Sequence, residues 1–308
     1  MRGKNMIYTL TCNPALDYAV RTDKLCPGEL HRPTGTIAYG GKGVNLSRAL
    51  TALGIPNRAL GFIAGVTGQI LAQGVRNEGI DTDFIRLATG DTRINVKVLA
   101  DRETELNALG PAIDEAAWRE LYRKLEALRP GDMLCLCGSV PPPDGVKTYA
   151  KILDHLRGKG IRTAVDCGGS GLNKVIAFSP DVIKPNRAEL EEAVGRPLPD
   201  RAACIEAMRE CRQRGAKTIL LSLGKDGAML ADGEEIYACA APSGKVVSTI
   251  GSGDSMLAGF LAARENGLSA AQALCRGIAC GSARAFTPGA FSAEVADRLY
   301  SGLQAQKL

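Results

Sequence analysis

The chain has 308 residues, of which 45% are hydrophobic and 23% charged, and its formal net charge is +5. This composition is typical of a folded globular protein and excludes a disordered or fibrous one. The charge is spread along the sequence and only 5% of the residues are aromatic, which argues against a nucleic-acid partner. An anionic small-molecule substrate would explain the positive balance, although solubility alone would also account for it.

The ten cysteines lie mostly inside apolar runs, without a C-x-x-C pair or the spacing of zinc ligands. We therefore expect buried, reduced thiols, as in cytosolic proteins. Residues 1–10 lack the apolar core and cleavage site of a signal peptide, and no run of about 18 apolar residues occurs. These features predict a cytoplasmic protein that is neither exported nor embedded in a membrane.

Short apolar runs predict buried strands, and amphipathic stretches of helical length lie between them. The predicted strands span residues 6–11, 58–64, 132–137, 162–166, 181–184 and 218–222, and the predicted helices span residues 44–53, 69–78, 115–128, 145–157 and 202–214. Strands that alternate with helices indicate a doubly wound α/β fold, with a mostly parallel sheet covered on both faces.

Two segments, residues 18–38 and 84–107, break this alternation. Residues 92–98 alternate polar and apolar side chains, as a strand with one solvated face does. We interpret both segments as a small β-sheet lid over the active site, inserted into the core at about residues 14–38 and 84–110. No repeat or linker is visible, so residues 1–308 are predicted to form one domain. Near its end, helices over 253–265 and 270–285 are rich in small residues and should pack closely.

The strongest local motif is the run TIGSGDS at residues 249–255, which precedes an apolar helix. N–H groups at a helix start are uncovered and carry partial positive charge, so Gly251, Ser252 and Gly253 predict an anion hole for a moving phosphoryl group. Asp254 would be ionised there and could accept the proton of a hydroxyl. An ordinary N-terminal helix cap is the alternative.

A second glycine cluster, GGKGVN at residues 40–45, leads into another predicted helix. It fails the dinucleotide pattern because Leu46 stands where the third glycine belongs, and it fails the P-loop pattern because Gly43 follows Lys42. Gly41, Lys42 and Asn45 remain as a backbone surface with a lysine and an amide, which could bind hydroxyls and a phosphate.

Two further motifs follow predicted strands. In KPNRAE, residues 184–189, Asn186 and Glu189 have the spacing of a capping box; alternatively, Glu189 helps to hold Mg²⁺ near ATP phosphates through water. The run SLGKDG predicts either a hairpin turn or a nucleotide-contacting loop at the carboxyl end of the sheet. It consists of Ser222, Leu223, Gly224, Lys225, Asp226 and Gly227.

In this order, the four motifs resemble those of the ribokinase-like (PfkB) carbohydrate kinases, over residues 7–289. The run NPALD at residues 13–17 is similar to the start of the branch that contains phosphofructokinases and tagatose-phosphate kinases, and residues 92–98 and 103–107 look most like bacterial 1-phosphofructokinases. Two departures are visible: Ser252 replaces the usual alanine, and Cys167 stands where many members have serine.

The resemblance implies a role for each candidate residue. The sugar site would be lined by Asp17, Gly41, Lys42, Asn45 and Ser139, and Arg93 would bind the substrate phosphate. The N-x-x-E magnesium motif would be matched by Asn186 and Glu189, and the nucleotide loop by residues 222–227. The anion hole and the base would be supplied by Gly251, Ser252, Gly253 and Asp254. The resemblance also implies dimerisation through the lid.

The implied reaction is transfer of the ATP γ-phosphoryl group, with Mg²⁺, to a phosphorylated ketohexose, above all fructose 1-phosphate to fructose 1,6-bisphosphate. Arg93, Asn95 and Lys97 are spaced two apart on one strand face, and two cations with an amide favour a dianionic sugar phosphate. A solvated outer face is the alternative. The residues leave open a tagatose-6-phosphate kinase, a 6-phosphofructokinase or a catalytically silent sugar-phosphate sensor.

Overall fold

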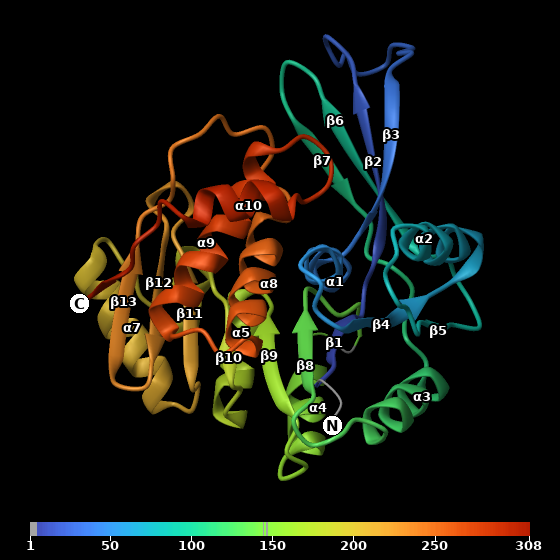
Figure 1. Ribbon diagram of the computed structural model, residues 1–308. Coiled ribbons are helices and arrows are strands. Elements are labelled where there is room, and N and C mark those ends of the chain that lie inside the picture. The colour runs from blue at the N-terminus through green and yellow to red at the C-terminus, as the bar shows by residue number, and fades with distance from the viewer. Residues whose placement is uncertain (1–4, 144, 146) are drawn as a thin grey trace.

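A ten-stranded sheet forms the centre of the molecule (Figure 1), in a computed structural model that describes residues 5–143, 145 and 147–308. The strand order is β14-β13-β12-β11-β10-β9-β8-β1-β4-β5. The strands are β1 (Ile7–Thr11), β4 (Asn57–Ile63), β5 (Ile85–Arg86), β8 (Met133–Cys137), β9 (Arg162–Asp166), β10 (Val182–Ile183), β11 (Thr218–Ser222), β12 (Ala228–Asp232), β13 (Glu235–Cys239) and β14 (Gln306–Lys307).

Neighbouring strands from β11 to β5 are parallel, and β12, β13 and β14 add an antiparallel edge. The predicted doubly wound, mostly parallel sheet is therefore confirmed. All six apolar runs predicted as strands lie in this sheet, and the runs 162–166 and 218–222 match β9 and β11 to the residue.

Helices cover both faces because successive side chains of each central strand enter opposite cores. In β8, Leu134 and Leu136 pack into one core, whereas Cys135 and Cys137 pack into the other. The first core is closed by α3 (Glu115–Glu126), α4 (Lys147–Leu156), α5 (Gly169–Val175), α6 (Arg187–Val194) and α7 (Arg201–Gln213), and the second by α1 (Lys42–Ala52), α8 (Ser252–Glu265), α9 (Ala270–Phe286) and α10 (Ala293–Tyr300).

The lid is a separate four-stranded sheet that rises above α1 and α2 in Figure 1. Its strand order is β3 (Thr34–Gly40), β2 (Ala15–Arg21), β6 (Arg93–Leu99) and β7 (Thr104–Asn107). The central pair, β2 and β6, is parallel. A third, smaller core under the lid packs it on α2 (Gly65–Asn77).

The second lid segment begins later than the predicted residue 84. Ile85 is buried and pairs with Phe62 of β4, so β5 extends the main sheet, and the first lid residue after it is Arg93. The first segment runs two residues further than expected, to Gly40. Ile85 joins the main sheet because an apolar side chain is more stable buried beside β4 than on a lid strand with one solvated face.

Close packing of the two small-residue helices is confirmed. A Cβ on Gly259 of α8 would lie 2.6 Å from the Sγ of Cys280 in α9, and a Cβ on Gly281 would lie 3.0 Å from the carbonyl oxygen of Ser252. The glycines therefore let α9 pass directly beside the first turn of α8, where Asp254 lies.

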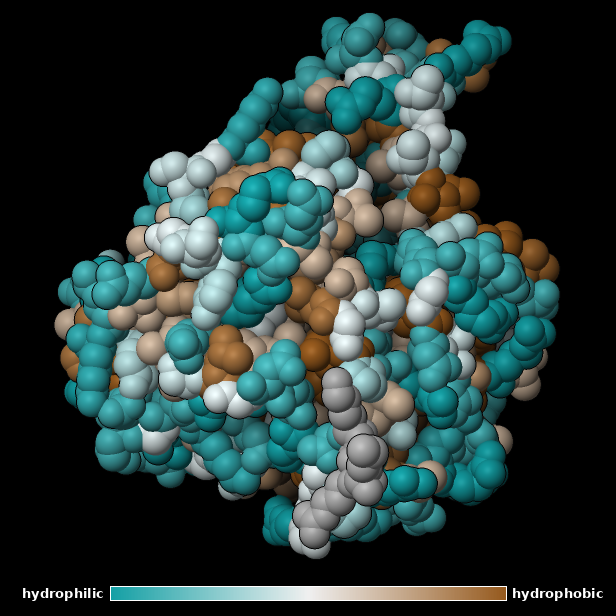
Figure 2. All heavy atoms as spheres, in the orientation of Figure 1, coloured by the Kyte–Doolittle hydropathy of each residue, from teal (hydrophilic) through white to brown (hydrophobic). Residues whose placement is uncertain are grey.

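No disulfide is formed among the described residues, which include all ten cysteines, and all of these except Cys26 are buried, as expected. Within the described residues, no helix is long and apolar enough to cross a membrane. The face in Figure 2 is largely hydrophilic, with apolar side chains gathered on the right, near the position of α2 in Figure 1. Residues 1–4 and Val146, which the sequence-based predictions included, lie outside the described residues.

Candidate active site

The carboxyl group of Asp254 is buried in the first turn of α8, with the residue 7% exposed. The Nδ2 of Asn45 in α1 donates a hydrogen bond to its Oδ2 at 2.9 Å. Burial, and then the negative charge of Asp166, raise the pKa of Asp254 to about 6. A carboxylate with a pKa near neutrality can take a proton and release it again.

Asn45 is itself held in place by Arg48, one turn further along α1. The Nη1 of Arg48 donates to the Oδ1 of Asn45 at 2.7 Å, which fixes the amide so that its NH₂ group faces Asp254. The Nε of Arg48 donates to Glu78 at 2.8 Å, and Nη2 donates to the carbonyl oxygen of Tyr39 at 2.8 Å. A chain of charge-assisted bonds thus runs from the surface to the candidate base.

A buried carboxylate, Asp166 at the end of β9, joins two lysines next to this site. Lys42 lies 2.7 Å from its Oδ1, and Lys184 lies 3.0 Å from its Oδ2. Burial alone would raise the pKa of Asp166, but the two lysines outweigh burial and the pKa is lowered. Asp166 therefore stays ionised and fixes two cations at the carboxyl ends of the strands.

One N–H group of the predicted anion hole, that of Ser252, already has a partner within the chain. Gly251 takes the left-handed conformation at φ 75°, which lets the chain turn into α8, and the N–H of Ser252 is already bonded to the carbonyl oxygen of Thr249 at 3.2 Å. The N–H groups of Gly253 and Asp254 have no acceptor in the described part of the chain. These two groups, rather than that of Ser252, are free to bind an anion at the dipole's positive end.

The capping box predicted at residues 186–189 is formed. The backbone N–H of Asn186 donates to Glu189 Oε2 at 2.9 Å, and the N–H of Glu189 donates to Asn186 Oδ1 at 2.9 Å. The other oxygen of Glu189 lies 3.8 Å from Lys42 Nζ. One carboxylate oxygen of Glu189 is thus used by the cap. The other faces the charged cluster that contains Asp166 and Lys42.

The predicted nucleotide loop lies next to that cap. Ser222 forms a parallel bridge with Asn186, so two candidate segments are neighbours. Residues Gly224–Asp226 form one exposed turn of 3₁₀ helix, and the N–H of Leu223 donates to the carbonyl oxygen of Gly227 at 2.9 Å. The segment is therefore a hairpin connection from β11 to antiparallel β12, at the carboxyl end of the parallel strands. Contact with a nucleotide stays a prediction.

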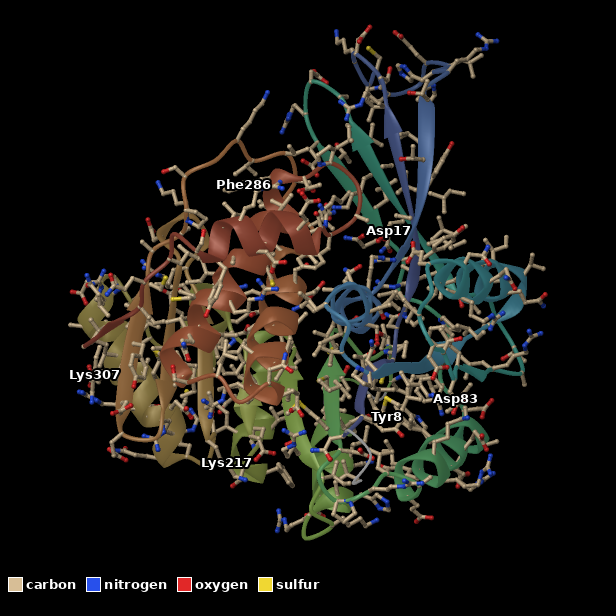
Figure 3. All side chains as sticks on the ribbon, in the orientation of Figure 1. Tyr8, Asp17, Asp83, Lys217, Phe286 and Lys307 are labelled. Atoms are coloured by element: carbon tan, nitrogen blue, oxygen red, sulfur yellow. The ribbon has the colours of Figure 1, made fainter. Side chains whose placement is uncertain are left out.

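The lid brings Asp17 over α1, as Figure 3 shows at the lid's base. Its Oδ1 accepts a hydrogen bond from Nδ2 of Asn95 in the neighbouring strand at 2.9 Å. Gly40 is needed beside it, because a Cβ there would lie 2.0 Å from Asp17 Oδ2. Burial raises the pKa of Asp17, which is the expected cost of holding a carboxylate where sugar hydroxyls could bind it.

The two cations on this face of β6 have partners within the chain. Arg93 donates to the carbonyl oxygens of Asn13 and Ala108, at distances between 3.0 and 3.2 Å, and Lys97 is paired with Glu105. Local partners thus satisfy both cations without a ligand. Arg93 still bonds only to neutral carbonyls, and burial lowers its pKa, so an anion would bind it more strongly.

Several buried polar atoms at the base of the lid lack a partner among the described residues. They are Thr11 Oγ1, at the end of β1, Asn13 Oδ1 and Asn95 Oδ1. Ser139 is exposed nearby, with its Oγ 3.5 Å from Asn13 Nδ2. Buried polar groups are normally satisfied, so these oxygens fit a site that binds hydroxyl groups.

Sequence reasoning missed Asp166 as a site residue, and also Lys184, Arg48 and Arg284. Arg284, in the last turn of α9, lies beside Gly251: its Nε is 3.7 Å from the position that a Cβ on Gly251 would occupy. None of these residues belongs to a local motif that demands its side chain. Lys184 alone carried a signal, since a buried lysine at the end of an apolar strand requires an anionic partner.

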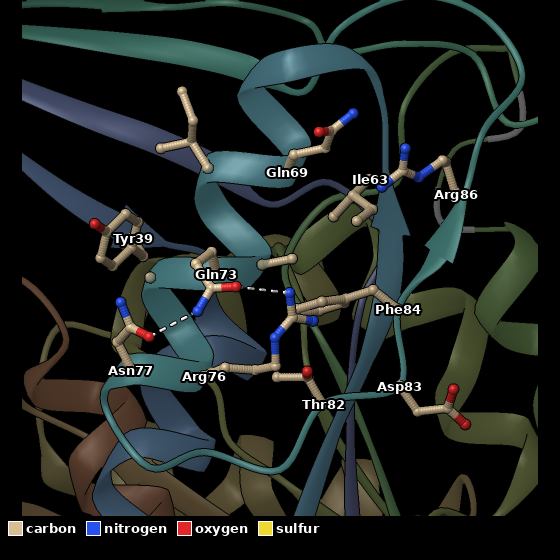
Figure 4. Close-up of a pocket in the computed structure, with 13 residues that line it drawn as sticks. Tyr39, Ile63, Gln69, Gln73, Arg76, Asn77, Thr82, Asp83, Phe84 and Arg86 are labelled. Atoms are coloured by element: carbon tan, nitrogen blue, oxygen red, sulfur yellow. Dashed lines mark hydrogen bonds between the residues drawn. The ribbon is translucent and has the colours of Figure 1, made fainter.

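A hollow of about 690 Å³ between α2, β4 and β5 is separate from this site (Figure 4). Its polar side chains bond to one another, with Gln73 donating to Asn77 at 2.8 Å and accepting from Arg76 at 3.4 Å. None of the predicted site residues lines it. Its size alone therefore does not make it the place of the chemistry.

The model of the pfkB family of carbohydrate kinases matches residues 4–296. This chain belongs to that family. It is accordingly a phosphotransferase with an alcohol group as acceptor, and kinases of this family use ATP.

Individual relatives match over nearly the whole length of this pfkB kinase. The 1-phosphofructokinase of Bacillus subtilis is 34% identical over 98% of this chain and 100% of its own, and the D-tagatose-1-phosphate kinase of Bacillus licheniformis is 36% identical over 97% and 99%. Phosphofructokinase-2 from Escherichia coli, solved with substrates and products, superposes with a TM-score of 0.90 at 29% identity, over 96% and 98% of the two chains. The same protein is also known in a tetrameric inhibited form.

Proposed function

We propose that this pfkB kinase is a 1-phosphofructokinase, which converts fructose 1-phosphate to fructose 1,6-bisphosphate with ATP. The observation that carries the proposal is the buried Asp254, held by Asn45 beside the open N–H groups of Gly253 and Asp254. A silent sugar-phosphate sensor would not need a base with a pKa near 6 beside an anion site.

In the proposed reaction, Asp254 accepts the proton of the sugar hydroxyl as that oxygen forms its bond to the γ-phosphorus. The bond from the γ-phosphorus to its bridging oxygen breaks, and ADP leaves with the electron pair. The N–H groups of Gly253 and Asp254 and the ammonium of Lys184 bind the negative charge on the moving phosphoryl group. A Cβ on Gly253 would lie 3.2 Å from Lys184 Nζ, so lysine and backbone face the same space.

The sugar phosphate would lie between the lid and α1. Asp17, Asn45 and the unsatisfied oxygens at the lid's base would bind its hydroxyls. Gly41 and Ser139 would line the same space, and Arg93 would bind the phosphate that the sugar already carries.

Residues 222–227, with Asn186, would contact the nucleotide. The carboxylates present fit a hydrated Mg²⁺, because Glu189 has one oxygen outside its capping bond and Asp166 lies in the same cluster. In the described part of the chain, no group of three or more metal-binding side chains could hold an ion alone. This agrees with a metal bound mainly by water and ATP phosphates, where it would supply positive charge to the phosphates.

Two relatives that match over nearly their full length are named 1-phosphofructokinase and D-tagatose-1-phosphate kinase. Both names favour a ketose 1-phosphate over a ketose 6-phosphate as the substrate. The sequence alone had left a tagatose-6-phosphate or 6-phosphofructokinase activity as alternatives, and D-tagatose 1-phosphate now joins them. Each alternative predicts a different best substrate in one assay.

The test is a coupled ADP-release assay across fructose 1-phosphate, fructose 6-phosphate, tagatose 1-phosphate, tagatose 6-phosphate and free fructose. We expect the highest kcat/KM for fructose 1-phosphate and little turnover of fructose. Asp254→Asn should lower kcat by roughly 10²–10⁴ with ATP affinity nearly unchanged. Turnover within a few fold of the parent would show that Asp254 is not the base.

We also infer that two copies pair through the lid. One row of apolar and aromatic side chains crosses the four lid strands on the face opposite Asp17. It consists of Ile37, Tyr18, Val96 and Leu106. Ile37 is 56% exposed and Leu106 60%, and a second copy of the same face would cover such a row. The whole chain would act as one catalytic domain in the cytoplasm, where cysteines that form no disulfide in the described part of the chain would stay reduced.

A further inference from the structure

Arg284 stands out among the cations around Asp254 because it has no acidic partner in the part of the chain that the structure describes. Lys42 and Lys184 share Asp166, and Arg48 is paired with Glu78. Across the described residues, Arg284 forms no ion pair, and its one hydrogen bond is a long one of 3.4 Å to the carbonyl oxygen of Thr287. A half-buried guanidinium without an anion is unfavourable unless a ligand supplies one.

The packing of α9 on α8 aims this side chain at the anion site. Gly281, one turn before Arg284, lies against the carbonyl of Ser252 in the first turn of α8. The Nε of Arg284 and the Nδ2 of Asn45 both lie 3.7 Å from the position of a Cβ on Gly251. Lys184 occupies the corresponding place at Gly253, at 3.2 Å. Two cations therefore flank the turn that starts α8, one at each glycine.

The charges around Arg284 favour binding of an anion there. Burial and then the nearby charge of Arg48 lower its pKa, and Asp254 only partly offsets them. Asp254 accepts a hydrogen bond from Asn45, and within the described residues no bond joins its carboxylate to Arg284. An incoming group with negative charge on several oxygens would relieve the repulsion between the two arginines.

We propose that Arg284 binds the phosphoryl group while it passes from ATP to the sugar, opposite Lys184. This inference rests on the proposed function. The planar fork of guanidinium N–H groups matches the equatorial oxygens of a phosphoryl group, and its charge stays constant at neutral pH. Arg284 thus supplies a fixed cation where charge is spread over those oxygens.

If Arg284 only stabilises the end of α9, its substitution should affect stability rather than catalysis. An arginine in the last turn of a helix stabilises the helix end by its charge and by bonds to the last carbonyl groups. Arg264 is the matched case in this chain, because it lies in the last turn of α8, bonds to the carbonyl oxygen of Leu268 at 3.5 Å and pairs with Asp232 at 3.3 Å. Arg264→Met is therefore the control for loss of a helix-end cation.

The experiment compares Arg284→Met, Arg284→Lys and Arg264→Met in the full chain. For Arg284→Met we expect kcat to fall by about 10²-fold, the loss typical of one anion-hole donor, with both KM values changed by less than about threefold. Arg284→Lys should lose less, because the charge remains. Arg264→Met should lower the melting temperature without lowering kcat.

Binding of ADP with aluminium fluoride, a planar mimic of the moving phosphoryl group, is the second measurement. Arg284→Met should weaken this complex by a factor similar to the loss in kcat and leave the affinity for ADP alone unchanged. If Arg284→Met does not fold, the same two measurements on Arg284→Lys test the proposal. Lysine lacks the planar fork of guanidinium N–H groups, so this variant should still weaken the complex of ADP with aluminium fluoride selectively.

Three results would overturn the assignment: an unchanged kcat, an increase only in the KM for the sugar phosphate, or equal weakening of ADP and of its fluoride complex. A parent protein that transfers no phosphoryl group to any sugar phosphate would overturn the proposed function, and the role of Arg284 with it. An active parent protein together with an Arg284→Met variant of unchanged kcat would overturn only the role of Arg284.

Discussion

If Asp254 is the base, as proposed, its carboxyl group makes the reaction depend on pH in a predictable direction. Only the ionised form can accept a proton, and burial together with the charge of Asp166 raises its pKa to about 6. We therefore expect kcat/KM for the sugar phosphate to fall as the pH drops through about 6.

Asp166→Asn should move this acid limb to lower pH, because it removes the negative charge that opposes ionisation of Asp254. A pH–rate profile of both proteins measures the shift. Asp81→Asn, a partly exposed carboxylate paired with Arg58, serves as the control. An acid limb that stays in place in Asp166→Asn would contradict the electrostatic coupling.

Glu189 caps α6, and its proposed role beside Mg²⁺ can be tested separately from the cap. Glu189→Gln keeps an oxygen that can accept from the N–H of Asn186, so the capping box and the melting temperature should be retained. The Mg²⁺ concentration for half-maximal rate should rise several-fold, because a charge near the hydrated ion is lost. Titration of the rate with Mg²⁺ measures this.

The capping box of α9 provides the control for Glu189. Gln272→Ala removes the group that accepts from the N–H of Ser269, so it should lower the melting temperature and leave the Mg²⁺ dependence alone. If Glu189→Gln behaves like Gln272→Ala, Glu189 is only a cap.

Residues inside contiguous motifs were predictable from the sequence, and their partners were not. Asp254 could be proposed from the sequence because glycines at a helix start have a local reason to be there. Asp166 and Arg284 reach the site only through the pairing of β9 and the packing of α9 on α8. Such long-range contacts leave no spacing pattern in a single sequence.

At the level of elements, strand β6 carries the proposed contact between the lid and the substrate phosphate. Arg93 bonds to carbonyls on both sides of the lid's base, at Asn13 and Ala108, which places the guanidinium before a substrate arrives. Arg93→Lys should raise the KM for fructose 1-phosphate by about tenfold or more and change the KM for ATP little, since a bidentate charge-assisted contact is lost.

Lys97→Ala is the matched control on the same face of β6, because Lys97 is already paired with Glu105. It should leave the KM for the sugar phosphate nearly unchanged. An Arg93→Lys variant with the parent's KM would mean that Arg93 only ties the lid to its base.

Elements with a strong hydrophobic period were predicted well, including the alternating strand over residues 92–98. The start of the second lid segment was not, because two residues, Ile85 and Arg86, are too few to show a period. Only tertiary pairing with β4 decides that they extend the main sheet.

The whole molecule should be a dimer because the lid presents an apolar row to solvent. The double variant Ile37→Asp, Leu106→Glu places charges in that row and should halve the mass measured by sedimentation. Val66→Asp, at an apolar position on α2 that is 67% exposed, should not change the mass. A monomeric parent would rule out the lid interface.

The parallel pairing of β2 with β6 also constrains how the chain folds. Asp17 and Asn95 are 78 positions apart in the sequence, and α1, β4, α2 and β5 all lie between them. Closing so long a loop is slow unless the intervening elements have already brought its ends together. We therefore predict that the main sheet assembles first and that the lid forms last. In pulsed hydrogen exchange during refolding, amides of β1, β4 and β8 should become protected before those of β2 and β6, and earlier protection of the lid would refute this order.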